Sequence, residues 1–256
     1  MLRSILLMIL AGVAFLSSCV AYSPMQPAIS TIRKAGEVEL TTSLQHSIRL
    51  EAGAVYSPIS HLLLSGTGAV RPRGQTVEPL GTLQGEVGLG TYWALGPQWQ
   101  INGLMGYGRA VSNQNSLDVL GSNTLYRAHY HKLYGQVSGV CYSTESNAGF
   151  VYRLSQVRFD ALDYFYPAEA GAIPISRLLY HEALWFYRHK LGQQTMRWHW
   201  QIAGGFSVPQ GRRQKEPEYG PDKWAIYEAN RNLSGVPMLS MGIVFQLGNQ
   251  RKSKND

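Results

Sequence analysis

Residues 85–108 read GEVGLGTYWALGPQWQINGLMGYG, and this stretch decides the fold class. Apolar side chains alternate with small or polar ones, a Gly-Pro pair separates the two tryptophans, and no charged residue stands between Glu86 and Arg109. A period of two is typical of a β-strand, because successive side chains point to opposite faces. The stretch therefore predicts a hairpin with one apolar face, one polar face and tryptophan beside its turn.

The composition favours an all-β protein with a lipid-facing surface. Charged residues make up 15% of the 256-residue chain, against about 25% in typical soluble domains. Aromatic residues make up 11%, with 15 Tyr and 6 Trp, and 27 residues are Gly. The two cysteines, Cys19 and Cys141, are too few for a disulfide framework or a cysteine-based zinc cluster.

The period of two continues along most of the chain and divides it into about ten runs, each near the length of about 9–11 residues that a tilted transmembrane strand needs. We therefore expect a closed antiparallel up-and-down transmembrane β-barrel over residues 37–247, followed by a polar C-terminal tail at 248–256. The expected strands are 37–45, 47–56, 61–70, 81–93, 98–109, 126–141, 149–160, 177–189, 195–207 and 237–247.

The connections between these runs alternate between short and long, apart from the short first hairpin at Gln45-His46. The long ones are 71–80, 110–125, 161–176 and 208–236. In outer-membrane barrels, short turns lie in the periplasm and long loops lie outside. Because an even number of strands returns the chain to its starting side, we expect both the N- and the C-terminus in the periplasm.

The N-terminal residues predict export and a lipid anchor. Residues 1–18 have the apolar core of a signal peptide, too short to cross a bilayer as a helix. The end of this segment, Leu16-Ser17-Ser18-Cys19, resembles the bacterial lipobox. The resemblance implies cleavage before Cys19 and acylation of its thiol, which makes the mature chain a palmitate-bearing lipoprotein. Residues 19–36 are then expected to form a periplasmic linker that begins at the acylated Cys19.

The chain as a whole resembles uncharacterised outer-membrane β-barrel lipoproteins of Gram-negative bacteria. The resemblance rests on Cys19, Tyr22, Pro24, the pair Gly36-Glu37 that leads into the first strand, and the strand pattern through Leu247. It implies a location in the cell outer membrane. Val20 follows the cysteine where the inner-membrane retention signal has Asp, and by resemblance this also points to the outer membrane.

Several charged residues are expected to face the lumen. A barrel of eight to ten strands is filled by side chains or holds one small ligand, so these charges must pair with one another. We expect a structural network that closes the lumen; the alternatives are a small polar pore and a ligand-binding lumen. The expected lumen charges are Arg49, Glu51, Glu86, Arg153, Glu182 and Arg197.

Aromatic residues beside the short turns predict an interfacial belt. The rings of Trp and Tyr are apolar while their N–H and O–H groups stay hydrated, which suits the boundary between lipid and water. On the outward-facing parity the expected members of the belt are Tyr56, Trp93, Trp99, Tyr187 and Trp198.

These features favour a lipid-anchored barrel with a structural or small-ligand-binding role over an enzyme. One alternative is an outer-membrane hydrolase acting on lipid A or peptides, which would need Ser or Asp near His at the outer rim; Asp160 and Asp163 are candidate acids. Another is a soluble periplasmic β-lipoprotein that binds a small molecule or a protein, in which the apolar face would point inward.

The expected partners are lipids. The net charge of +7 comes from scattered basic residues, which suit membrane lipid and anionic lipopolysaccharide better than nucleic acid. His129 and His131 share a strand face, but no third ligand is identifiable nearby, so we expect no metal site. No dinucleotide fingerprint or Walker motif is present, and no cofactor is expected.

Overall fold

The computed structural model describes residues 22–72, 80–117, 123–166, 169–173, 177–192, 197–210 and 235–248. The predicted signal peptide, Cys19 and the tail from residue 249 onward lie outside these residues. All the regular structure described is β-strand, and no described helix has the length and apolar character to span a membrane. The strands are β1 (Val38–Gln45), β2 (Arg49–Tyr56), β3 (Leu63–Pro72), β4 (Leu80–Leu95), β5 (Trp99–Leu117), β6 (Asn123–Tyr142), β7 (Ser146–Tyr166), β8 (Glu169–Ala172), β9 (Arg177–Lys190), β10 (Trp198–Gln210) and β11 (Val236–Leu247).

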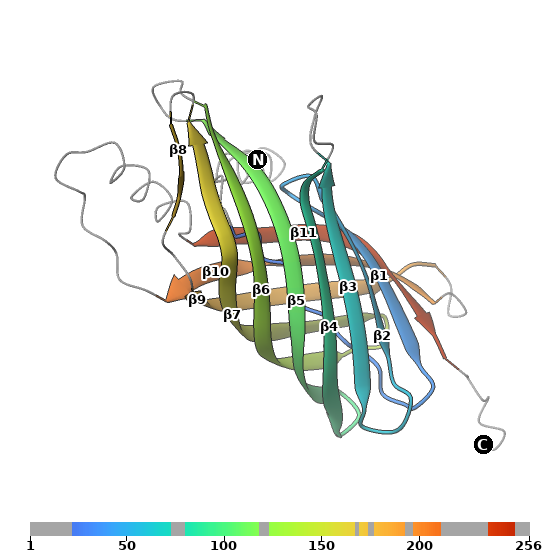
Figure 1. Cartoon of the computed structure of the whole chain (residues 1–256). Coiled ribbons are helices and arrows are strands. Elements are labelled where there is room, and N and C mark those ends of the chain that lie inside the picture. Colours follow the sequence, from blue (N-terminus) through green and yellow to red (C-terminus); the bar gives the residue numbers. More distant parts are fainter. Residues whose placement is uncertain are drawn as a thin grey trace, which may run out of the picture.

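Ten of these strands form a closed antiparallel barrel, which confirms the predicted fold (Figure 1). Each strand pairs with its neighbours in the chain, and β1 closes the cylinder on β11 over eight residue pairs. The four-residue β8 is an addition that pairs only with the end of β7. Because β1 pairs with β11, neither of these two strands is left as an open edge of the sheet.

The two ends of the barrel differ. At one end, called the short-turn end below, lie the connections β2–β3, β4–β5, β6–β7 and β9–β10, together with the start of β1 and the end of β11. The other end, the long-loop end, carries the remaining connections. Gly96 in the β4–β5 turn has a φ of +79°, a left-handed conformation that glycine adopts without steric cost.

Three neighbouring strands extend beyond the rest at the long-loop end. β5, β6 and β7 have 19, 20 and 21 residues, whereas β1 and β2 have eight each. Much of the connections expected at 110–125 and 161–176 is therefore strand. The sequence pattern misses these extensions because the pattern reverses beyond the apolar band. There Tyr126, Leu162 and Tyr164 are buried inside, while the charged Arg127 and Asp163 stand on the opposite face and are partly exposed.

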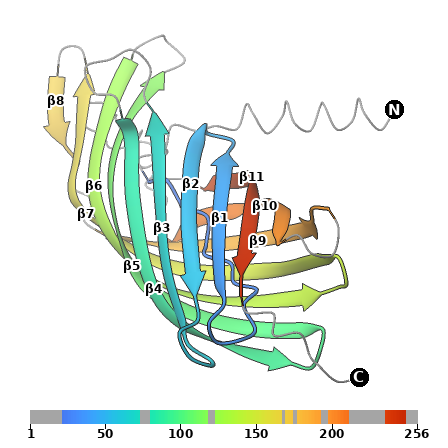
Figure 2. The ribbon, with the colours of Figure 1, turned by 90° about the vertical axis from the view of Figure 1, so that its right-hand side faces the viewer.

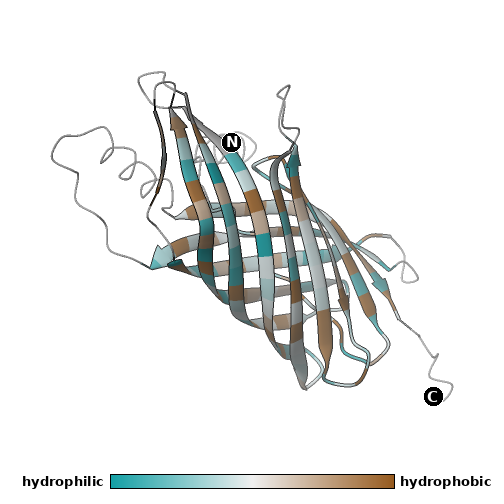
Figure 3. Cartoon of the chain, in the orientation of Figure 1, coloured by the Kyte–Doolittle hydropathy of each residue, from teal (hydrophilic) through white to brown (hydrophobic). Residues whose placement is uncertain are grey.

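The outer wall of the barrel is apolar. Val87, Met105 and Phe206 are 63%, 68% and 65% exposed, and hydrophobic and hydrophilic residues alternate along the strands (Figure 3). Polar side chains such as Gln100 and Ser155 point inward and are fully buried. A soluble β-sandwich would have the opposite arrangement, with its apolar face buried.

The lumen is occupied by the chain's own N-terminal part, residues 22–32, which we call the lumen segment. It runs inside the curved wall as a thin trace without regular secondary structure (Figure 2). Tyr22, Met25, Ile29 and Ile32 are each at most 3% exposed. This region was expected to be a linker, because it contains prolines and has no period. A segment enclosed by wall on all sides has no exposed face, so no periodicity marks it.

Candidate functional site

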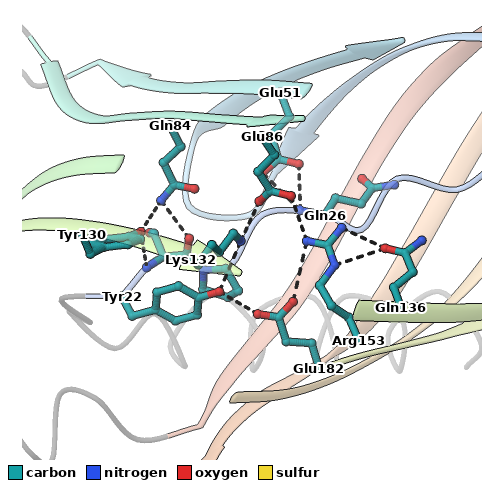
Figure 4. Close-up of polar contacts among 12 residues, drawn as sticks. Tyr22, Gln26, Glu51, Gln84, Glu86, Tyr130, Lys132, Gln136, Arg153 and Glu182 are labelled. Carbon is teal, nitrogen blue, oxygen red and sulfur yellow. Dashed lines mark hydrogen bonds and ion pairs between the residues drawn. The ribbon is translucent and has the colours of Figure 1, made fainter. Parts of the chain in front are cut away.

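The centre of the lumen holds a buried charge network (Figure 4). Glu86 on β4 forms ion pairs with Lys132 on β6 at 2.6 Å and with Arg153 on β7 at 3.1 Å. Arg153 lies 3.9 Å from Glu182 on β9 and donates two hydrogen bonds to Gln136. The two acids and two bases balance in charge, as buried ions must if their desolvation is to be offset.

Tyr22 of the lumen segment joins this network. Its hydroxyl donates a 2.7 Å hydrogen bond to Glu182 and accepts one of 3.4 Å from Lys132. Its ring stacks on Tyr180, with a centroid distance of 4.2 Å, and is tilted against Tyr130 at 5.5 Å. The N-terminal segment thus contributes both a polar group and apolar area to the site.

A second group of contacts holds the lumen segment near the β1–β2 turn. Arg49 and Glu51 form a 2.7 Å ion pair on β2. The Arg49 guanidinium donates to the Pro24 carbonyl, and Glu51 accepts a 3.1 Å hydrogen bond from the backbone N–H of Gln26. Gln45 donates a 2.8 Å hydrogen bond to Glu51. The pair therefore holds the chain by its backbone as well as satisfying its own charges.

A third group lies nearer the short-turn end. Arg188 on β9 and Glu39 on β1 form a 2.7 Å ion pair. Thr31 lies between them: its hydroxyl donates to Glu39 at 2.6 Å and accepts from Arg188 at 3.2 Å. Gln246 on β11 also donates to this hydroxyl, at 2.6 Å.

The wall also satisfies the backbone carbonyls along most of the segment. Since an unpaired buried carbonyl is costly, these donors hold the segment in one position. The bonds run from Gln84 to the Ser23 oxygen at 2.8 Å, Gln136 to Ala28 at 2.6 Å, Arg188 to Ile29 at 3.2 Å, Asn102 to Ser30 at 3.0 Å, Tyr142 to Thr31 at 3.1 Å and Gln100 to Ile32 at 3.0 Å.

The direction of the lumen segment follows from these contacts. Tyr22 meets Glu182, the sixth residue of β9 counted from the long-loop end. Arg33, just after the segment, donates to the carbonyls of Gly96 and Pro97 in the β4–β5 turn. The chain therefore crosses the lumen from the long-loop half to the short-turn end and then enters β1.

Little space is left in this part of the lumen. A pocket beside the segment, between residues 26–29 and strands β1 and β2, has a volume of about 30 Å³. This is room for about one water molecule, far below the several hundred Å³ of a typical small-molecule site. The contacts suit a sealed and rigid interior.

The structure brings together most of the residues expected in the lumen. Arg49, Glu51, Glu86, Arg153 and Glu182 are each at most 6% exposed and take part in the contacts above. Arg197 is not among them: it precedes β10 at the short-turn end, is partly exposed, and its carbonyl accepts from the backbone N–H of Gln246. It lies at the end of the barrel because β10 begins at Trp198, three residues later than expected.

Sequence reasoning missed three charged members of the site, Glu39, Lys132 and Arg188. A signal for two of them was present. Lys132 has the same parity on β6 as Gln136, and Arg188 has the same parity on β9 as Glu182, so alternation alone assigns both to the lumen.

The five aromatic residues expected at the interface all lie on the outer surface near the short-turn end. Tyr56, Trp93, Trp99 and Trp198 are 41%, 55%, 53% and 45% exposed, and Tyr187 is partly exposed. Trp99 starts β5 and Trp198 starts β10, so the rings stand where the wall meets the turns.

The features of a hydrolase are present only in part. His131 and Asp160 form a 3.1 Å pair on the outer wall, and the Tyr107 ring stacks on His131. The contacts of the described residues bring no serine or cysteine to this pair. In the same part of the chain, no three His, Cys, Asp or Glu side chains are grouped to hold a metal ion.

No protein-family model and no curated protein matches the chain. Among solved structures it is similar to the CymD monoaromatic hydrocarbon channel, at 7% identity and a TM-score of 0.30, over 83% of this chain and 88% of that one. It is also similar to OmpT, an outer membrane protein of Vibrio cholerae. For the in-vitro folded form the identity is 8% and the TM-score 0.20, over 82% of this chain and 96% of that one. For the loop L8 deletion mutant of OmpT the identity is also 8% and the TM-score 0.20, over 82% of this chain and 98% of that one.

Proposed function

We propose that this chain is an outer-membrane β-barrel with a structural role, closed by its own N-terminal segment and anchored by an acyl group on Cys19. The observation that carries the proposal is the set of hydrogen bonds from wall side chains to the backbone of residues 23–32. A segment held at so many points along the lumen blocks free diffusion. It fits a fixed component of the barrel better than it fits a gate.

The membrane location rests on the outer wall. A water-soluble monomer rarely exposes apolar patches beyond a few hundred Å², whereas this wall exposes large apolar side chains around the barrel. Lipid tails would cover them at no cost. The aromatic rings near the short-turn end, from Tyr56 to Trp198, fit the boundary between lipid and water.

For the lipid anchor we propose the long-loop side, in place of the periplasmic side that strand parity predicts for the N-terminus. Tyr22 lies in the long-loop half of the lumen, and the three residues back to Cys19 span at most about 11 Å. We infer that this reach is too short for Cys19 to lie at the short-turn end. With short turns in the periplasm, an acyl group on Cys19 would enter the outer leaflet.

Conductance tests the closed lumen. The purified protein in a planar bilayer should give no stable current steps, and a variant lacking residues 22–32 should give them if it folds. Folding is checked independently, because a folded barrel migrates faster on a gel when unheated than after boiling. Conductance of the native protein would rule out the proposed closure, and absence of the heat-dependent shift would rule out the barrel.

Labelling tests the anchor. Cys19→Ala should abolish palmitate incorporation, and persistent incorporation would contradict acylation at this residue. An epitope inserted between Val20 and Ala21 should bind antibody on intact cells. Binding only after permeabilisation would place the anchor in the periplasm and overturn the proposed side.

A further inference from the structure

Four basic side chains lie in one row across the outer wall. Arg109 on β5 pairs in register with His131 on β6, His131 with Arg158 on β7, and Arg158 with Arg177 on β9. The three arginines are exposed and His131 is partly exposed. Because neighbouring strands lie about 4.8 Å apart, this basic row spans about 14 Å.

Ten residues along each strand from the basic row, toward the short-turn end, lies a second row that includes two of the belt aromatics. On the same four strands, Trp99, Cys141, Ala148 and Tyr187 are also paired in register. Ten residues of strand extend about 34 Å, and a tilt of about 40° reduces this to about 26 Å along the barrel axis. This distance matches the apolar band of about 25 Å on outer-membrane barrels.

The wall between the two rows carries no formal charge. Only alternate positions face outward, and none of them is Lys, Arg, Asp or Glu. They are 101, 103, 105 and 107 of β5, 133, 135, 137 and 139 of β6, 150, 152, 154 and 156 of β7, and 179, 181, 183 and 185 of β9. The basic row is therefore the first charged layer on these strands toward the long-loop end. It stands where the apolar band gives way to the headgroup region.

An apolar groove adjoins the basic row on the side of the short turns. It has a volume of about 790 Å³, and its lining includes Met105, Tyr107, Leu133, Gly135, Leu154 and Leu179. Gly135 leaves its floor open, since a Cβ at this position would meet no atom within 4 Å. A groove of this character is suited to an acyl chain.

The three arginines of the row lack neutralising partners among the described residues. Asp160 pairs with His131, but in the described part of the chain Arg109, Arg158 and Arg177 form no ion pair or side-chain hydrogen bond. Like charges opposite one another on neighbouring strands destabilise a sheet. An anion shared among them would remove this repulsion, and the planar guanidinium fork suits phosphate oxygens.

We propose that the basic row binds the phosphate groups of lipopolysaccharide, while one of its acyl chains lies in the adjoining groove. The inference rests on the proposed membrane location and adds a specific lipid partner to it. Lipopolysaccharide is favoured over a lipid with one phosphate because the row offers three unpaired cations across about 14 Å. Because the strands are tilted, the four residues of the row stand at different heights along the barrel axis. The arginine side chains are long, so their charged ends can still reach the same headgroup layer.

Binding of fluorescent lipopolysaccharide to the purified protein in non-ionic detergent tests this site. The triple variant R109Q/R158Q/R177Q should bind at least about tenfold more weakly, since each lost contact is charge-assisted. The control triple variant K34Q/K190Q/R197Q removes the same charge at the short-turn end and should stay within about twofold of the native protein. A triple Arg→Lys variant, which keeps the charges, should lose less than the Gln variant.

Ligand controls separate the possible sources of phosphate. Dephosphorylated lipopolysaccharide should bind weakly, and phosphatidylglycerol or inorganic phosphate should compete poorly. Equal loss in the two Gln variants, or equal competition by phosphatidylglycerol, would overturn the site. Each variant is first shown to keep the heat-dependent gel shift, so a failed site is distinguishable from a failed barrel. If the triple Gln variant does not fold, R158Q alone should weaken binding about threefold, and unchanged binding would refute the proposal.

Discussion

Arg188 on β9 forms a 2.7 Å ion pair with Glu39 on β1, although two other strands separate β9 from β1 in the wall. The pair crosses the interior, and Thr31 of the lumen segment donates to one partner and accepts from the other. Arg188 is 1% exposed and Glu39 is fully buried. Wall and segment are therefore joined by one set of charge-assisted contacts.

Removing one partner of this pair should destabilise the barrel strongly. Glu39→Gln leaves the Arg188 guanidinium buried without its counter-ion, a change that typically costs about 3–5 kcal/mol. Urea unfolding in detergent micelles, followed by tryptophan fluorescence, measures the loss. Lys34→Gln on the exposed surface should stay within about 0.5 kcal/mol. A loss of similar size for both variants would contradict a role for the pair.

Two glycines on β5 should differ sharply in their tolerance of a methyl group. A Cβ at Gly106 would lie 2.5 Å from the Tyr134 ring and 2.3 Å from the Val87 carbonyl, whereas one at Gly103 would meet no atom within 4 Å. Gly106→Ala should therefore cost about 1–3 kcal/mol through overpacking, and Gly103→Ala should be close to neutral. Urea midpoints of the two variants provide the comparison, and equal midpoints would argue against close packing at Gly106.

A charge in the middle of the apolar band separates a lipid-facing wall from a hydrated one. Met105 is 68% exposed, and its strand carries Trp99 on one side and Arg109 on the other. If lipid covers this position, Met105→Arg should destabilise the folded barrel in vesicles by about 2–4 kcal/mol. Thr144→Arg, in the exposed β6–β7 turn, is the control. Folding yields are read from the unheated gel, and no effect at Met105 would mean that water covers the wall.

Stability should depend on pH through His46 in the β1–β2 turn. Burial, the largest effect, and the nearby Arg49 cation lower the pKa of His46 from 6.5, while a hydrogen bond to Leu239 opposes the shift. As the pH falls below 6.5, His46 binds a proton in the unfolded chain but stays neutral in the folded chain. Stability therefore falls with pH until the lower folded pKa is reached. His46→Gln should reduce this slope in urea midpoints measured from pH 7 downward. An unchanged slope would exclude His46 as its source.

Alternation and turn signals are enough to predict the barrel and the inward face of residues such as Glu86 and Arg153. The observed β2 spans Arg49–Tyr56 and β9 spans Arg177–Lys190, close to the expected 47–56 and 177–189. This succeeds because lipid outside and polar side chains inside impose one pattern on each strand. Glu86 and Arg153 are assigned to the lumen by that pattern alone, before any pairing of strands is known.

The contacts within the lumen are not predictable in the same way. Parity fixes the face of a residue, but the partner of Glu86 depends on strand register and shear, which bring Lys132 and Arg153 to the same height. The position of the lumen segment is still harder to predict from the sequence. Its burial comes from surrounding walls that belong to distant parts of the sequence, so nothing local separates it from a linker.

The location of residues 22–32 leads us to expect an order of assembly. They come before β1 in the chain, and β1 is also the strand that meets β11, the last to be made. If β1 paired with β11 before the segment was inside, Glu39 and Glu51 would be buried without two of their hydrogen-bond donors. These donors are the backbone N–H groups of Thr31 and Gln26. We therefore expect the seam between β1 and β11 to form after residues 22–32 have entered the lumen.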